Sequence, residues 1–243
     1  MSVIDFGVNM SKNDASLFEL PFEYVKKKVL PKREKFWKDG VEDRWWLHQR
    51  TRPAFRDALA AKARYLATPR HSKFRFFVWL DSATVPDSAL AVVARDDEYM
   101  LGILSSRAHE IWARAQGTQV RDVESGFRYT PESCFDTFPF PWPPGKEDQS
   151  GPLVQAIATA ASELVRQRDE WLNPPGADED ELKQRTLTKL YNRRAAGEMT
   201  WLDNAHRTLD AAVFAAYGWP ADLSRDEILS RLLDLNRARA AVV

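Results

Sequence analysis

Apolar residues repeat at helical spacing in the last part of the chain. Leu153, Ile157, Ala161 and Leu164 recur every three to four residues, which predicts a helix that ends before Pro174. Further helices are expected over 178–194, 199–217 and 224–240. The last has Ser224 and Glu227 at the spacing of a capping box. The segment after residue 145 is therefore predicted to be all-α.

The middle of the chain has a different pattern. Residues 53–65 have helical spacing, whereas 73–79 (KFRFFVW) and 90–94 (LAVVA) are rich in the aromatic and β-branched residues typical of strands. Apolar positions over 99–112 predict a helix that is interrupted or begins near Gly102, and 117–126 reads as a polar loop. The fold class predicted is α+β, a mixed α/β body followed by an all-α helical element.

Residues 127–144, FRYTPESCFDTFPFPWPP, combine aromatic rings with prolines. Proline lacks an amide hydrogen and pushes its neighbours toward extended geometry, so this tract suits neither a helix nor a central strand. A surface course would expose the large rings of Phe135, Phe138, Phe140 and Trp142. A covering surface, within this chain or beyond it, is therefore expected.

Length and composition are those of a globular protein. The 243 residues are 44% hydrophobic and 29% charged, and the single cysteine, Cys134, excludes an internal disulfide. No signal sequence and no apolar run of about 18 residues is present, so a cytoplasmic location without a membrane is expected. We predict a lead-in over 1–20, disordered in part or whole, a mixed α/β domain over 21–145 and a helical domain over 146–243.

The charges are segregated along the chain. The 35 basic and 35 acidic residues cancel, yet residues 26–75 hold sixteen Lys or Arg against five Asp or Glu, a local balance of +11. Such a block is typical of nucleic-acid binding, where cations displace counterions from phosphates. The alternative is a basic face that is simply solvated.

No catalytic or metal-binding motif stands out. The four histidines lack a metal-ligand spacing, and Cys134 has no base nearby in sequence and is expected to be a small buried residue. Asn173, Pro174 and Pro175 resemble the start of an Asn-Pro-Pro-aromatic motif, but Gly176 takes the place of the stacking ring. A helix stop explains this tripeptide better, and nothing in the chain makes an enzyme by itself.

The basic residues at the start of the β region are the stronger candidates. Lys73 and Arg75 would share one face of the strand predicted over 73–79, since alternate residues point the same way. Paired cations there could lie along phosphates or read guanine in the major groove. The alternative is a strand whose outer face is simply charged.

Six segments, in their order along the chain, resemble a known protein family. They are RYLATPR at 64–70, FRFFVW at 74–79, PDSALAVVARDDEYMLGILSSRAHEIWA at 86–113, the tract at 127–144, LKQRTLTKLYNRR at 182–194 and WLDNAHRTLDAAVFAAYGWPADLSRDEILSRLLDLN at 201–236. Together they resemble the C-terminal half of the large single-chain adenine-specific DNA methyltransferases of type IIG and IIL restriction-modification systems. The resemblance covers roughly residues 20–240.

The resemblance implies a division of labour. The chain would hold the target-recognition domain and the C-terminal helices, with no catalytic residue, no metal and no cofactor of its own. S-adenosylmethionine and the catalytic motif would belong to a methyltransferase domain or subunit encoded upstream, on which the Phe135–Trp142 rings would dock. Double-stranded DNA is the other expected partner.

From charge and placement, seven residues are expected to bind DNA: Arg64, Arg70, His71, Lys73, Arg75, Arg107 and Arg128. A smaller set near Arg70, Lys73 and Arg75, with Arg107 or Arg128, is expected to read base edges. Five are expected to contact phosphates: Lys26, Lys27, Lys28, Arg52 and Arg56. Two alternatives stay open. In one, the chain is a free-standing DNA-binding or interaction protein. In the other, it is a methyltransferase gene fragment without function.

Overall fold

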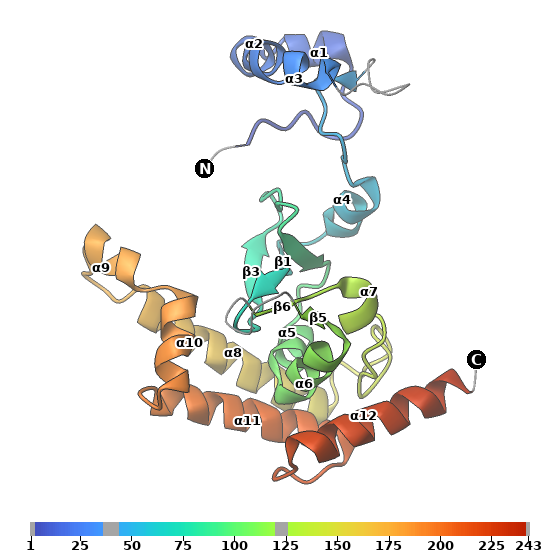
Figure 1. Ribbon diagram of the computed structural model, residues 1–243, viewed down its shortest axis with the longest axis vertical. Coiled ribbons are helices and arrows are strands. Elements are labelled where there is room, and N and C mark those ends of the chain that lie inside the picture. The colour runs from blue at the N-terminus through green and yellow to red at the C-terminus, as the bar shows by residue number, and fades with distance from the viewer. Residues whose placement is uncertain (1–2, 36–43, 120–125, 242–243) are drawn as a thin grey trace. The chain divides into compact units, whose positions relative to one another are not determined.

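The computed structural model describes residues 3–35, 44–119 and 126–241 (Figure 1). By its internal contacts the chain divides into two compact units, Met1–Lys62 and Ala63–Val243. Within the described ranges, no helix combines the length and the apolar character needed to cross a bilayer.

The first unit has a small core of its own. Its helices are α1 (Lys12–Ser16), α2 (Glu19–Lys28), α3 (Leu30–Glu34) and α4 (Pro53–Leu59). Phe6, Phe22 and Trp45 pack together in this core, and the Trp46 indole N–H donates to the Met10 carbonyl at 2.9 Å. Residues 3–20 are thus part of a packed unit and not the disordered lead-in that was expected. The helix expected over 53–65 ends at Leu59.

Two small antiparallel sheets form the β part of the second unit. One consists of β1 (Arg64–Pro69), β3 (Val78–Asp81) and β4 (Leu90–Val93), in the order β3-β1-β4. The other consists of β2 (His71–Ser72), β5 (Thr118–Gln119) and β6 (Phe127–Arg128), in the order β2-β6-β5. The strand expected over 73–79 therefore begins only at Val78, and β1 was not predicted.

The rest of the second unit is mainly helical. Its helices are α5 (Glu98–Ser105), α6 (Arg107–Gln116), α7 (Pro131–Cys134), α8 (Pro152–Leu172), α9 (Glu179–Gln184), α10 (Leu187–Ala195), α11 (Thr200–Tyr217) and α12 (Arg225–Ala240). The long helix α8 packs against α5 and α11, and α12 packs against α6. Helices α5 and α8 approach closely at Gly102, where a Cβ atom would lie 2.6 Å from Ile157 Cγ2.

The C-terminal helices fall where the apolar periodicity places them, with one exception. The capping box of α12 is present: the Ser224 amide donates to Glu227 Oε2 at 2.8 Å, and the Glu227 amide donates to Ser224 Oγ. The helix expected over 178–194 is broken, because Thr186 caps the new helix α10 by accepting the Lys189 amide. In the middle region the break falls at Ser106, which caps α6, and not at Gly102.

The aromatic tract is covered by the chain's own helices. Phe138 and Phe140 are only 4% and 3% exposed, and Phe135 and Trp142 pack partly buried against the same core. Carbonyl groups of the tract accept hydrogen bonds from side chains that are distant in the sequence. Tyr217 donates to Pro139 at 2.9 Å, and Arg239 donates to Phe140 at 2.6 Å. Phe138 and Phe140 are therefore not free to dock on another domain.

One core joins the β part to the C-terminal helices. Phe77 and Tyr129 from the β part belong to the same buried cluster as Leu164 of α8 and Leu209 of α11. The structure thus groups 63–145 with 146–243, in contrast to the domain boundary expected after residue 145. The reason is that α8 and α11 bury their apolar faces against α5 and not only against each other.

Two buried histidines pair with tyrosines in this core. His109 Nδ1 donates to the Leu104 carbonyl at 3.0 Å, so its Nε2 accepts from the Tyr129 hydroxyl at 3.1 Å. His206 Nε2 lies 2.9 Å from the Tyr191 hydroxyl. Burial lowers the pKa of His109 to about 3 and the pKa of His206 well below its ordinary value, so both rings are neutral at pH 7.

The fold should therefore lose stability on mild acidification. In the unfolded chain each histidine takes up a proton near pH 6.5, whereas the folded state resists protonation of His109 down to about pH 3. Each ring then lowers the free energy of unfolding by up to about 1.4 kcal/mol per pH unit as the pH falls below 6.5. Asp210, whose pKa burial raises to about 6, opposes part of this loss.

The comparison of wild type with His109→Gln isolates one ring, because Asp210 is common to both. Urea unfolding between pH 7 and pH 5 gives the slope of the free energy of unfolding against pH. At pH 5 this slope should be smaller in the variant by the equivalent of nearly one bound proton. Identical pH slopes in the two proteins would show that His109 is not held neutral.

Candidate nucleic-acid interface

Three exposed side chains lie side by side across the β2-β6-β5 sheet. Arg128 on β6 pairs with His71 on β2 and with Thr118 on β5. Residues directly opposite one another on antiparallel strands point to the same face, with Cβ atoms about 5 Å apart. All three are exposed, and no carboxylate of the described residues forms an ion pair with Arg128. We call His71, Arg128 and Thr118 the reading row.

Backbone contacts fix the flank of this row. The Arg70 amide donates to the Ala89 carbonyl, and the Arg70 carbonyl accepts from the Tyr129 amide, both at 2.7 Å. The Arg70 side chain reaches along the surface and donates to the Ser88 carbonyl at 3.0 Å. Gly126 has a φ of +78°, and a Cβ atom there would lie 2.0 Å from the Ser72 carbonyl oxygen. Only glycine lets β6 approach β2 this closely.

Arg75 lies beneath the row and not on a surface. It is 6% exposed, and its guanidinium donates to Thr68 Oγ1 at 2.8 Å and to the carbonyls of Pro69 and Phe127. The Phe127 and Tyr129 rings lie 4.6 and 4.9 Å from the guanidinium carbon. Burial lowers the pKa of Arg75 to about 10, so it remains charged at pH 7. The expectation that Lys73 and Arg75 share an exposed strand face is wrong, because 73–77 form no strand.

Lys73 remains on the surface beside the row. Its ammonium group donates to Asn192 Oδ1 on α10 at 3.0 Å, and its carbonyl accepts from the Arg114 guanidinium at 3.1 Å. No carboxylate of the described residues forms an ion pair with Lys73. Its charge is thus available to an anion.

Two other predicted DNA-binding residues are engaged elsewhere. Arg64 begins β1, pairs with Glu98 at 2.6 Å and lies 3.9 Å above the Trp79 ring. Arg107 is at the opposite end of α6 from Thr118, where its amide donates to Asp210 and its guanidinium donates to the Leu223 carbonyl at 2.9 Å. The fold therefore gathers Arg70, His71, Lys73 and Arg128 but separates Arg64 and Arg107 from them.

The five predicted phosphate contacts all lie in the first unit. Lys26, Lys27 and Lys28 are exposed on α2, and Lys26 pairs with Glu23 at 3.1 Å. Arg52 precedes α4 with a left-handed backbone, φ 53° and ψ 55°. Arg56 is held by Asp5 at 2.8 Å. A role of these residues toward phosphates stays a prediction.

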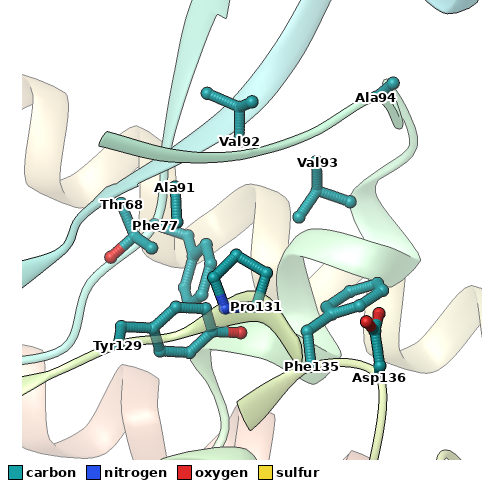
Figure 2. A pocket seen from close by; sticks show the side chains of 10 residues that line it. All are labelled: Thr68, Phe77, Ala91, Val92, Val93, Ala94, Tyr129, Pro131, Phe135 and Asp136. Carbon is teal, nitrogen blue, oxygen red and sulfur yellow. The ribbon is translucent and has the colours of Figure 1, made fainter. Parts of the chain in front are cut away.

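A cavity of about 250 Å³ lies between β4 and α7. Figure 2 shows Val92 on β4 and Ala94 just beyond its end above the cavity, and Tyr129, Pro131, Phe135 and Asp136 along the segment below. Its polar atoms are largely engaged already: Thr68 Oγ1 donates to the Phe76 carbonyl, and the Tyr129 hydroxyl contacts His109. Apart from the exposed Asp136 carboxylate, the lining offers few convergent polar groups of the kind that fix a substrate.

Sequence reasoning missed Thr118 and Gly126. Both stood in a segment that reads as a polar loop. The role of Gly126 depends on Ser72, more than fifty positions earlier, whereas Thr118 pairs with Arg128, ten positions later. Within the described part of the chain, no group of three or more His, Cys, Asp or Glu side chains is placed to hold a metal ion.

Comparisons with known proteins bear on this surface. Residues 53–142 match the family model described as MmeI, target recognition domain. The chain is 29% identical over 167 residues to DNA methyltransferase A of Bacillus subtilis (strain 168), covering 68% of this chain and 16% of that protein. It also resembles the type IIL restriction-modification enzyme MmeI in a structure with DNA, with a TM-score of 0.61 and 21% identity over 93% of this chain and 26% of that one. The chain thus spans a small part of the length of these relatives.

The position of Arg75 predicts a structural effect of its removal. Arg75→Ala leaves Thr68 Oγ1 and the carbonyls of Pro69 and Phe127 without this donor, and should lower the free energy of unfolding by about 2–4 kcal/mol. Arg128→Ala, at an exposed position, should change it by less than about 0.5 kcal/mol. Urea unfolding of both variants measures this contrast. Equal small changes would contradict the anchoring role of Arg75.

Proposed function

Because residues 53–142 match the family model of the MmeI target recognition domain, we propose that this chain is the DNA-sequence-recognition part of a restriction-modification methyltransferase. The methyltransferase is proposed to be adenine-specific and to act on double-stranded DNA. The chain supplies specificity, and the chemistry belongs to another part of the protein or to a second subunit.

The reading row carries this proposal. His71, Arg128 and Thr118 lie within the matched residues and project from strands whose other side is packed on the core, where Phe127 is 5% exposed. Arg70 extends the row toward the turn at Ser88. Exposed side chains on a rigid scaffold are what direct readout of base edges requires, and no carboxylate of the described residues forms an ion pair with Arg128.

The chemistry of the row suits the major groove. That groove is about 12 Å wide and admits a two-stranded ribbon. The Arg128 guanidinium can donate two hydrogen bonds to O6 and N7 of a guanine, whereas His71 and Thr118 can each donate to or accept from a neighbouring base edge. Three adjacent side chains thus suffice to distinguish two or three base pairs.

S-adenosylmethionine does not fit the residues of this chain. No strand of the described residues is followed by the glycine-rich turn on which a methyl donor is held. Asn173, the start of the Asn-Pro-Pro tripeptide, follows the last turn of α8 and donates to the Asp169 carbonyl at 3.3 Å, as a helix stop does. The cofactor and the flipped adenine are therefore assigned to the methyltransferase part.

The contact with that part is proposed to lie on the first unit. Phe138 and Phe140 are covered by the chain's own core. In contrast, Leu17 and Phe18 between α1 and α2, and Leu20 in the first turn of α2, are 79%, 53% and 87% exposed. Neighbouring exposed apolar residues at this density are typical of a surface that another domain covers.

Selection from a random duplex library tests the proposal. The chain should enrich one short sequence, and Arg128→Ala should relax the preference at one base pair, with a loss of about 1–3 kcal/mol in discrimination. The matched control is Lys27→Ala, which is expected to weaken binding to all sequences alike, as loss of a phosphate contact does.

Enrichment of no sequence by the wild type would exclude this function. Enrichment with an unchanged base profile in Arg128→Ala, and likewise in His71→Ala, would remove the reading row as its basis.

A further inference from the structure

A second basic surface lies on the C-terminal helices. Helices α9 and α10, together with the end of α8, enclose a groove of about 470 Å³. Its lining consists of Trp171, Glu181, Gln184, Arg185, Lys189, Asn192 and Arg193. We call it the α10 groove. Three cations and one carboxylate face the same space, which gives the groove a positive balance.

The partners of these cations differ. Glu181 neutralises Arg185 at 2.7 Å, and the Arg185 guanidinium covers the Trp171 ring at 5.3 Å. Lys189 bonds only the amide oxygen of Gln184, and no carboxylate of the described residues forms an ion pair with it. Arg193 pairs with Glu198 at 2.9 Å, but both side chains are about half exposed, so this pair is weak. Lys189 and Arg193 are thus the two charges available to an anion.

The α10 groove is continuous with the reading row. Lys73 is two residues beyond His71, so their Cα atoms lie within about 7 Å. Its ammonium group donates to Asn192, which lines the groove between Lys189 and Arg193. Lys189 and Arg193 are four positions apart on α10 and so share one face of the helix. A line of cations therefore leads from Arg128 past Lys73 to α10.

We propose that the α10 groove binds phosphates of the DNA strand that flanks the bases met by the reading row, with Lys73, Lys189 and Arg193 as the contacts. This inference rests on the proposed function and extends it to the helical part of the chain. A free nucleotide is a poorer occupant, because Arg185 already occupies the Trp171 face on which a base would stack. A backbone needs only spaced cations along an open path, and the groove provides them.

The salt dependence of binding tests the groove directly. Affinity of the 243-residue chain for the duplex that it selects is measured at several salt concentrations, for wild type and for the double variant Lys189→Gln/Arg193→Gln. Each phosphate contact contributes about 0.9 to the slope of log affinity against log salt, so the double variant should lower that slope by about 1.8. Its base preferences should stay those of the wild type.

Lys183→Gln is the matched control. Lys183 is exposed on α9, where it pairs with Asp180 at 3.0 Å and with Glu179 at 3.4 Å, and it is not among the residues that line the groove. This variant removes one positive charge outside the groove, against two inside it in the double variant, and should leave the slope unchanged. If the duplex is shortened on the side that contacts α10, wild type and the double variant should have the same slope of log affinity against log salt.

Two results would overturn the inference while the proposed function stands. One is a double variant with the wild-type slope in a chain that still selects its sequence. The other is a double variant with an altered base preference, which would make the groove a reading surface and not a phosphate site. A wild-type chain that binds no duplex would overturn the proposed function, and this inference with it. Thermal unfolding of the variants checks that folding is unchanged.

Discussion

The position of the reading row depends on a buried guanidinium. Arg75 joins the end of β1, through Thr68 and Pro69, to β6, through Phe127. Strands of two residues have too few ladder hydrogen bonds to hold their own position. A charge withdrawn from water is costly, but here carbonyl oxygens and two aromatic faces surround it. The Arg75 guanidinium thus fixes the position of the β2-β6-β5 sheet, which carries the exposed side chains of the reading row.

The helical element supports the same surface from the other side. At the start of the tract of prolines and aromatic residues the backbone bonds to itself, as where the Cys134 amide donates to the Thr130 carbonyl. Beyond α7, carbonyls of the tract accept from the side chains of Tyr217 on α11 and of Asn236 and Arg239 on α12. Its rings close the core over α6. The tract is thus an internal strap between β6 and the last two helices, α11 and α12.

Local patterns carried the prediction of the helices. The apolar period of α8, the capping box of α12 and the extent of α11 depend on residues three or four positions apart, and a sequence displays these directly. The sheets depend on distant partners: β1 pairs with β4 across some twenty residues, and β2 pairs with β6 across more than fifty. Without those partners, FRFFVW looks like a longer strand than it is.

The same distinction separates the parts of the candidate site. A basic segment near residue 70 was visible from charge alone, and it does contain Arg70, His71 and Lys73 at one edge of the body. The burial of Arg75 was not visible, because its acceptors include Phe127, fifty-two residues away. Likewise the link from Lys73 to Asn192 spans 119 residues, so the basic path to α10 exists only in the folded chain.

Backbone amide chemical shifts of the isotopically labelled chain, titrated with the duplex that it selects, test the central claim most directly. The largest changes are predicted at His71, Arg128 and Thr118, with smaller ones at Lys73 and along α10. A titration that saturates while these amides stay unmoved, with the changes gathered elsewhere on the chain, would contradict the assignment of this surface to DNA recognition.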